Sequence, residues 1–127
     1  KGFNHVTIRV KNLVRSLSFY QEILGMKLVH RGRTDAYLSW GDAWVCLIEI
    51  HNAQEHSKNR VGIDHIAFTI SEEDFPDAVE ILKRNQVTMI REPVQRGGGK
   101  SVQFLDPDST VIELFTGDLE KRMKVWG

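Results

Sequence analysis

The chain has 127 residues, a common length for a single domain, and 41% of them are hydrophobic, which is enough for a sizeable core. Lysine plus arginine and aspartate plus glutamate both number 17, so the formal net charge is zero, which argues against a nucleic-acid or membrane-surface binder. The longest apolar stretch, AWVCLIEI, is too short to span a bilayer. Cys46 is the only cysteine, which excludes an internal disulfide, and we expect a cytoplasmic setting.

The first half of the chain predicts a strand, a helix and three further strands. NHVTIRV, residues 4–10, alternates as a strand does. KNLVRSLSFYQEILG, residues 11–25, has apolar residues at helical spacing, with Asn12 as its N-cap and Gly25 as its stop. The three strands that follow, separated by glycine turn signals, are MKLVHRG (26–32), DAYLSW (35–40) and AWVCLIEI (43–50).

The second half repeats this pattern. DHIAFTI, residues 64–70, is a near copy of the first strand, with its histidine in the same place. In SEEDFPDAVEILKRNQ, residues 71–86, a capping arrangement at Ser71 and Asp74 precedes a helical apolar stripe. A repeat on this scale indicates two copies of one supersecondary unit. The three strands that close the second copy are VTMIREP (87–93), KSVQFLD (100–106) and TVIELFTG (110–117).

We therefore expect an α+β fold built from two βαβββ modules, at residues about 1–50 and 63–117. Each module alone would leave one sheet face exposed, so we expect the two to pair into one curved mixed sheet around a metal cavity. The polar, aperiodic segment 51–62 links them, and a short helix is expected at 118–126. Nothing marks a boundary between independent domains, so residues 1–127 are expected to form a single domain.

Three residues suggest the metal. His5 and His65 take matching places in matching strands, and Glu113 lies in the last strand among apolar neighbours, where a lone carboxylate is costly to bury. Facing one cavity, they would form a two-histidine, one-carboxylate site that leaves coordination positions open for water or substrate. Each also has an ordinary explanation: an exposed strand start, a hydrogen-bonded core histidine and an ion-paired glutamate. The repeat favours the metal site, because it predicts where the second histidine lies.

The same residues resemble a known group. Two βαβββ modules with His at the first strand of each, together with FYQEILGMKLV and FLDPDSTVIELF, resemble the vicinal oxygen chelate superfamily over essentially the whole chain. That group includes glyoxalase I, extradiol dioxygenases, bleomycin-binding proteins and fosfomycin-resistance enzymes. NHVT, AYLSWGDAWVCL, DHIAF and TGDLEKRM are most similar to the fosfomycin-resistance thiol transferases. The resemblance implies an enzyme whose metal, usually manganese, binds fosfomycin while a low-molecular-weight thiol opens the epoxide.

That resemblance implies a role for particular residues. His5, His65 and Glu113 are the implied metal ligands, and Thr7 is implied to assist the epoxide oxygen, although Thr7 also fits as an ordinary strand former. The family is a dimer with paired modules from different subunits, so His5 is expected to serve a site completed by the other chain. The residue types alone leave manganese, iron, nickel and zinc open as the metal, and leave water open beside a thiol as the nucleophile.

Further side chains are expected at the substrate. Arg122 and Ser101 are implied to contact the phosphonate, for which a guanidinium is well shaped, although Arg122 also fits as a solvated residue of a terminal helix. Gln103 stands where the fosfomycin enzymes carry a tyrosine and is expected to donate a hydrogen bond. Tyr37 and Trp44 are expected to line the substrate cleft, and aromatic core packing is the ordinary alternative.

Two departures weaken the match to fosfomycin itself. The fosfomycin enzymes carry a basic residue where Pro93 aligns, and Arg96 or Lys100 could replace that positive charge here. Their loop has polar or acidic residues where this chain has Gly97–Gly99. A glycine-rich loop can hold an oxyanion through its backbone amides, but as a phosphate signature RGGGK is weak, and simple flexibility explains it equally well.

Three other functions stay open. A glyoxalase I-like isomerase usually has a fourth ligand in the first module, and we expect Cys46 to occupy the equivalent position. Glu49 would support that function only if its side chain turned inward. An extradiol dioxygenase shares the triad but requires a further acid or base. A bleomycin-type protein would bind a drug without chemistry, and such modules usually lack the triad.

Overall fold

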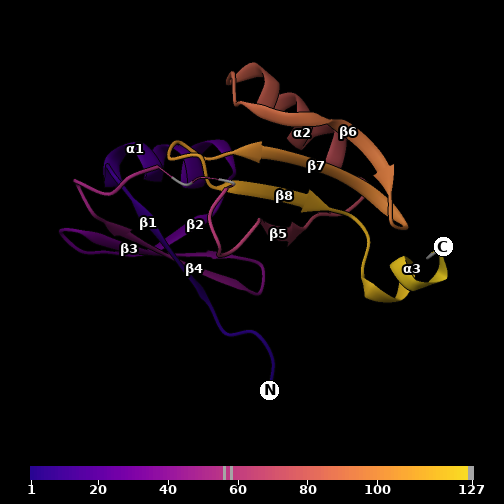
Figure 1. Cartoon of the computed structure of the whole chain (residues 1–127), viewed down its shortest axis with the longest axis horizontal. Coiled ribbons are helices and arrows are strands. Elements are labelled where there is room, and N and C mark those ends of the chain that lie inside the picture. The colour runs from indigo at the N-terminus through magenta and orange to yellow at the C-terminus, as the bar shows by residue number, and fades with distance from the viewer. Residues whose placement is uncertain (56, 58, 126–127) are drawn as a thin grey trace. The chain divides into compact units, whose positions relative to one another are not determined.

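The computed structural model describes residues 1–55, 57 and 59–125. The chain divides into two compact units, Lys1–His56 and Ser57–Gly127. Each unit contains one four-stranded mixed sheet with helical segments, so the predicted α+β class and the two βαβββ repeats are confirmed (Figure 1). The curved joint sheet, the cavity and the single-domain organisation remain predictions. None of the helices over the described residues has the length and apolar character needed to cross a membrane.

The sheet of the first unit has the strand order β1-β4-β3-β2. β1 runs parallel to β4, and the other neighbours are antiparallel. The helical segments follow β1 in the chain, as predicted. The elements are β1 (Val6–Val10), α1 (Leu13–Leu17), the π-helical segment η1 (Ser18–Ile23), β2 (Lys27–Arg31), β3 (Asp35–Trp40) and β4 (Ala43–Glu49).

The helix of this unit is anchored twice at its start. The Asn12 side chain accepts a hydrogen bond from the backbone N–H of Arg15 at 2.9 Å, which is the predicted N-cap. The Glu49 carboxylate at the end of β4 accepts from the backbone N–H of Leu13 at 2.8 Å. Glu49 therefore ties the helix to the sheet.

The continuation of this helix differs from the prediction. A regular α-helix was expected over residues 11–25, but the α-helical hydrogen bonding gives way to a π-helix at Ser18. The wider turn accompanies the burial of two consecutive rings, Phe19 and Tyr20, which meet edge-on with centroids 5.0 Å apart. An α-helical apolar stripe would hold only one of two adjacent residues at its centre, so periodicity alone does not predict this segment.

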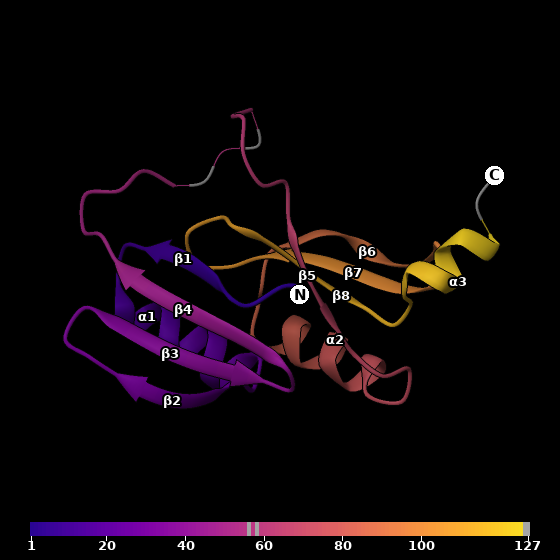
Figure 2. The same cartoon turned by 90° about the horizontal axis from the view of Figure 1, so that it is seen from below.

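The second unit repeats the topology with the strand order β5-β8-β7-β6, and α2 lies along its sheet (Figures 1 and 2). The Ser71 hydroxyl accepts from the N–H of Asp74 at 3.0 Å, and α2 begins one residue later. The helix expected at residues 118–126 is α3, and residue 126 lies outside the described residues. The elements are β5 (Ile66–Thr69), α2 (Phe75–Arg84), β6 (Met89–Arg96), β7 (Gly99–Leu105), β8 (Val111–Phe115) and α3 (Leu119–Lys124).

Each unit has its own apolar core. In β4 the side chains of Val45 and Leu47 are fully buried, while Trp44 and Ile48 are exposed, so the two faces of this sheet differ in character. The second unit buries Phe104 and Ile112 from its strands together with side chains of α2. The polar side chains described below are therefore held on well-packed sheets, which limits their freedom to move.

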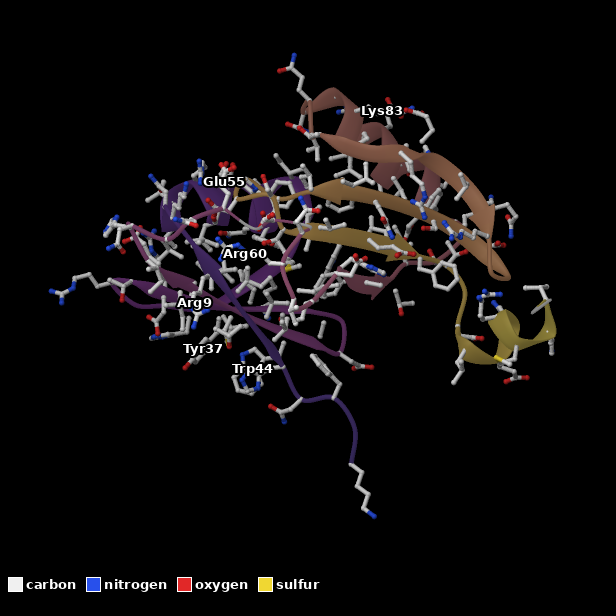
Figure 3. The ribbon with its side chains drawn as sticks, in the orientation of Figure 1. Arg9, Tyr37, Trp44, Glu55, Arg60 and Lys83 are labelled. Carbon is white, nitrogen blue, oxygen red and sulfur yellow. The ribbon has the colours of Figure 1, made fainter. Side chains whose placement is uncertain are left out.

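Glu49→Ala should lower the free energy of unfolding by about 1–3 kcal/mol, because the part-buried N–H of Leu13 loses its charged acceptor. Urea denaturation followed by circular dichroism measures this change. Glu55→Ala, at an exposed glutamate of the same unit (Figure 3), is the matched control and should have little effect. Equal stability of the parent and the Glu49 variant would show that the capping contact contributes nothing.

Candidate metal and substrate site

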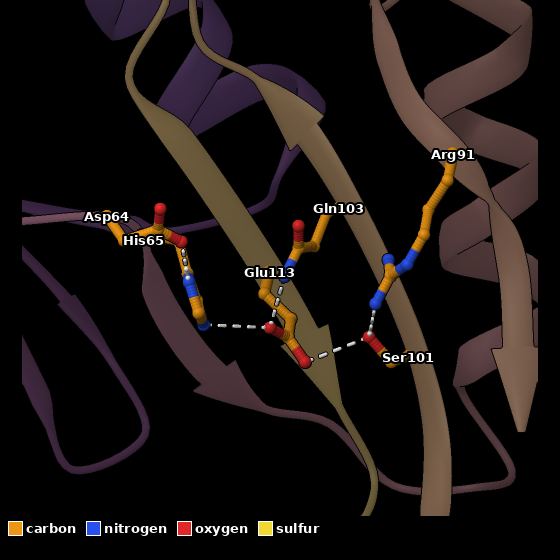
Figure 4. A network of polar contacts seen from close by, with 6 residues as sticks. All are labelled: Asp64, His65, Arg91, Ser101, Gln103 and Glu113. Carbon is orange, nitrogen blue, oxygen red and sulfur yellow. Dashed lines mark hydrogen bonds and ion pairs between the residues drawn. The ribbon is translucent and has the colours of Figure 1, made fainter. Parts of the chain in front are cut away.

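The Glu113 carboxylate is the centre of a polar network in the second unit (Figure 4). Glu113 is only 9% exposed, and both of its oxygens have partners. Oε1 accepts a hydrogen bond from Nε2 of Gln103 at 2.8 Å, and Oε2 accepts from the hydroxyl of Ser101 at 2.8 Å. Oε1 also lies 3.1 Å from Nε2 of His65. The carboxylate is therefore held in one orientation, with one edge turned toward the histidine.

Strand register explains how these residues meet. Glu113 of β8 lies directly opposite Gln103 of β7 on one side and Ala67 of β5 on the other, and cross-strand partners share a sheet face. His65 precedes Ala67 by two residues, and Ser101 precedes Gln103 by two, so the alternation of strand side chains brings both to the same face. The network is thus a direct product of pairing three strands.

The other ring nitrogen of His65 has a partner that fixes its tautomer. Nδ1 lies 2.8 Å from the Asp64 carboxylate. Because a carboxylate only accepts, Nδ1 carries the proton and donates it to Asp64. Nε2 of a neutral imidazole then presents a lone pair toward Oε1 of Glu113, which is also an acceptor. Two acceptors in this arrangement need a cation between or beside them, either a proton or a metal ion.

The separation fits two ligands of one metal. Donors at about 2.1 Å from an octahedral divalent cation, at right angles, lie about 3 Å apart. The observed distance between Nε2 of His65 and Oε1 of Glu113 is 3.1 Å. Throughout the described part of the chain, no group of three or more His, Cys, Asp or Glu side chains gathers as a complete metal site. The second unit therefore brings two potential metal ligands, His65 and Glu113, to a suitable distance from each other.

His5 in the first unit is prepared in the same way as His65. Its Nδ1 lies 2.7 Å from Oδ1 of the preceding residue, Asn4, as Nδ1 of His65 lies beside Asp64. An asparagine oxygen is also an acceptor, so Nε2 of His5 is likewise left with its lone pair. The ring of His5 lies 4.3 Å from that of Trp44. Each unit thus presents one histidine whose Nδ1 faces an acceptor, which leaves Nε2 as the nitrogen that could bind a metal.

Tyr37 and Trp44 come together on the first unit, as Figure 3 shows. Their rings meet edge-on with centroids 5.8 Å apart, and both side chains are about 40% exposed, with 40% for Tyr37 and 39% for Trp44. With His5 they form an aromatic cluster on the sheet. Neither ring is in the core, so both are available to contact a small molecule.

Thr7 and Cys46 are register partners, in the row that corresponds to Glu113 in the second unit. Cys46 lies opposite Thr7, two residues after His5, just as Glu113 lies opposite Ala67, two residues after His65. The first unit therefore has a thiol where the second has a carboxylate. Cys46 is buried and Thr7 is exposed. Glu49 is the carboxylate nearest to Cys46 in the sequence, and it accepts a hydrogen bond from the backbone N–H of Leu13 at the start of α1.

The glycine turn between β6 and β7 lies against the C-terminal segment. A Cβ added to Gly97 would lie 2.7 Å from Cδ of Arg122, and one added to Gly98 would lie 2.7 Å from the backbone oxygen of Lys121. Gly97 and Gly98 also have positive φ angles of 62° and 84°. The turn therefore packs closely against α3. This packing explains the glycines without a role in binding an oxyanion.

Arg91 is a member of the network that was not predicted from the sequence. Its Nη2 donates to the hydroxyl of Ser101 at 3.1 Å, next to Glu113 (Figure 4). The basic residue of the fosfomycin enzymes aligns with Pro93, two residues after Arg91, and this chain has no basic side chain at that position. The sequence does place an arginine, Arg91, within the predicted strand 87–93, and that was the available indication of a basic residue near the site.

Comparison with known proteins identifies a family and several similar proteins. The Glyoxalase/Bleomycin resistance protein/Dioxygenase superfamily matches residues 2–114. Metallothiol transferase FosB of Staphylococcus epidermidis is 40% identical over 128 residues, which are 99% of this chain and 91% of that protein. Glutathione transferase FosA of Serratia marcescens is 37% identical over 123 residues, which are 97% of this chain and 86% of that protein. The fosfomycin resistance protein FosX of Listeria monocytogenes, solved with Mn(II) and sulfate, has a TM-score of 0.80 and 28% identity and covers 99% of this chain and 98% of that one.

The chain belongs to the glyoxalase/bleomycin resistance protein/dioxygenase superfamily, as the sequence predicted. Within it, the protein is a metal-dependent enzyme of the glyoxalase and fosfomycin-resistance type, and its relatives include FosB and FosA thiol transferases. The roles assigned above to individual residues remain predictions.

Asp64→Ala should weaken manganese binding about 10- to 100-fold, because the His65 ring loses the partner that fixes its tautomer and orientation. Asp64→Asn keeps an acceptor, as Asn4 provides for His5, and should stay close to the parent. Calorimetric titration with Mn²⁺ measures both, with Asp77→Ala on the exposed side of α2 as the control. An unchanged affinity in Asp64→Ala would rule out this supporting role.

Gly98→Ala should destabilise the protein by about 2–3 kcal/mol, because it combines a positive φ with a clash against the backbone of Lys121. Gly41→Ala is the matched control: Gly41 also has a positive φ, but open space surrounds its Cβ position, so the loss should be only about 1 kcal/mol. Urea denaturation gives both values, and hydrogen exchange over residues 119–124 reports whether α3 is released. Equal losses in the two variants would show that α3 is not seated on the turn.

Proposed function

We propose that this enzyme inactivates fosfomycin by adding a low-molecular-weight thiol to its epoxide. The observation that supports this most directly is the pairing of Nε2 of His65 with Oε1 of Glu113, two lone-pair donors at a distance suited to one divalent metal. Relatives named metallothiol transferase and glutathione transferase, matched over nearly the whole chain, support a thiol as the co-substrate. Manganese is the metal we propose, since the similar FosX structure was solved with Mn(II).

His65 and Glu113 would hold the metal together with His5. We propose a homodimer in which each site takes His5 from one copy and the other two ligands from its partner. When bound, the metal would supply Lewis-acid stabilisation of the negative charge that develops on the epoxide oxygen. Gln103 and Ser101 keep the Glu113 carboxylate in the orientation that presents Oε1 to this position.

Other side chains would act on the substrate directly. Thr7, exposed on the same sheet face as His5, would donate a hydrogen bond to the oxygen released by ring opening. Arg122, held beside Gly97, would attract the phosphonate through its permanent charge. Tyr37 and Trp44 would form the apolar wall that excludes water from the attacking sulfur. A thiol co-substrate also agrees with the reducing, cytoplasmic setting expected for this chain.

The glyoxalase I-like alternative receives less support. It requires a further ligand from the first unit, and the candidate position holds Cys46. Glu49, the nearest carboxylate in sequence, accepts from Leu13 at 2.8 Å and lies 3.0 Å from Nε2 of His51. Both of its oxygens are thus engaged in holding the fold. An extradiol dioxygenase would need an additional acid or base that this network does not offer.

Glu113→Ala should abolish tight manganese binding and reduce fosfomycin turnover by at least about 1000-fold, because the site loses its only anionic ligand. The protein is loaded with Mn²⁺ and desalted, metal is counted by elemental analysis, and fosfomycin products with glutathione, cysteine or no thiol are followed by phosphorus NMR. Glu92→Ala, at an exposed glutamate of the same unit, is the control.

The products separate the candidate reactions. A thiol adduct supports the proposal, and a diol formed without thiol would assign water as the nucleophile. A parent protein that binds manganese but leaves fosfomycin intact, while isomerising the adduct of methylglyoxal with glutathione, would replace this proposal by the glyoxalase function. Full metal retention in Glu113→Ala would exclude Glu113 as a ligand.

A further inference from the structure

Arg91 reaches the site because β6 is irregular. The pairing of β6 with β7 shifts register between Met89 and Arg91 and again between Arg91 and Val94. Arg91 is left directly opposite Gln103, which in turn lies opposite Glu113. Pro93, which lacks a backbone N–H, falls within the second irregularity, where such a residue is tolerated. The two shifts therefore place a guanidinium on the same sheet face as the proposed metal ligand.

A count of hydrogens shows which group in the network is still able to donate. Ser101 has one hydroxyl hydrogen, which it gives to Oε2 of Glu113, and its oxygen accepts from Nη2 of Arg91. Ser101 therefore has no hydrogen left for a substrate. A guanidinium has five N–H donors. Nη1 of Arg91 is buried and has no hydrogen-bond partner among the described residues. Gln103 keeps one amide hydrogen beyond the one that it gives to Oε1 of Glu113, and the charged donors that remain belong to Arg91.

The charge of Arg91 is also unbalanced. A guanidinium is permanently charged, and the Arg91 side chain that carries it is part-buried. Within the described part of the chain, no carboxylate forms an ion pair with it, and the neighbouring Glu92 pairs instead with Lys83 at 2.8 Å. A buried donor without an acceptor, such as Nη1 of Arg91, is unfavourable because it has lost its hydrogen bonds to water. An arriving anion would remove that penalty.

We propose that Arg91 binds the anionic group of the substrate, a tetrahedral oxyanion of the phosphonate or phosphate class. The inference rests on the proposed function and adds a residue to it: Arg91 takes the place of the basic residue that is absent at Pro93. Nη1 is closed to water in the unliganded chain, so binding includes a rotation of the guanidinium toward the anion. Ser101 links that cation to Glu113, one hydroxyl away from the metal ligand.

Arg91 could instead act only on Glu113, holding Ser101 so that Ser101 orients the carboxylate. This positioning role and the binding role predict different measurements. Loss of a positioning residue would weaken manganese binding and lower kcat. Loss of an anion-binding residue would raise KM for fosfomycin and weaken the binding of simple phosphonates, with the metal affinity nearly unchanged.

Arg91→Gln removes the charge, Arg91→Lys keeps it without the planar fork, and Arg96→Gln removes an exposed arginine from the same strand as the matched control. Each protein is titrated with Mn²⁺ and, with and without Mn²⁺, with methylphosphonate by calorimetry. KM is measured separately for fosfomycin and for the thiol, and thermal unfolding verifies that each variant is folded. Arg91→Lys keeps the test valid if Arg91→Gln fails to fold.

We expect Arg91→Gln to weaken methylphosphonate binding and raise KM for fosfomycin by about 10- to 100-fold, with KM for the thiol and manganese affinity within about twofold of the parent. Arg91→Lys should fall between the parent and Arg91→Gln, and Arg96→Gln should match the parent. If the parent binds methylphosphonate through Arg91 but modifies no fosfomycin, the proposed reaction fails and this inference stands. Unchanged phosphonate binding and KM in both Arg91 variants, or a loss confined to manganese affinity, would overturn it.

Discussion

The approach of Nε2 of His65 to Oε1 of Glu113, at 3.1 Å, is the contact on which the proposed chemistry of this protein depends. Asp64 takes the proton-bearing nitrogen of the imidazole, so the histidine meets the carboxylate with a lone pair. Such an arrangement is unfavourable until a cation joins it. The β5-β8-β7 pairing nevertheless enforces it, because the three strands bring these residues to one face with little freedom. The fold therefore holds both side chains in the arrangement that the proposed metal site requires.

The two units use one topology for different purposes. In each, the first strand runs parallel to the last, and a histidine precedes it whose Nδ1 is fixed by the side chain just before it. Two residues after the histidine, the register partner is Cys46 in one unit and Glu113 in the other. Both units therefore have the histidine and the side chain that contacts its Nδ1, but they differ at the paired position, which is Cys46 in one and Glu113 in the other. This asymmetry leaves two histidines and one carboxylate as the proposed ligands, rather than a set of four.

Much of this was predictable from the sequence, because it depends on periodicity. The alternation of apolar and polar residues predicted the strands, and Asn12 predicted the start of the first helix. The histidine repeated at the start of two similar strands predicted the candidate ligands. The π-helix at Ser18 was missed, because adjacent buried rings carry no distinct periodic signal. The position of Arg91 was missed because it depends on register shifts in β6, which are set by pairing with β7 and not by β6 alone.

The arrangement of charge around Glu113 has a further consequence. Its oxygens accept from the amide of Gln103 and the hydroxyl of Ser101, both neutral donors, while the cation Arg91 is kept one hydroxyl away. A guanidinium bound directly to the carboxylate would compete with a metal ion for the same negative charge. Neutral donors fix the orientation of the carboxylate and leave most of its charge to a metal. In the proposed site, the intervening Ser101 would therefore keep the metal ligand apart from the anion-binding cation, and Ser101→Ala would remove the hydroxyl that links the two.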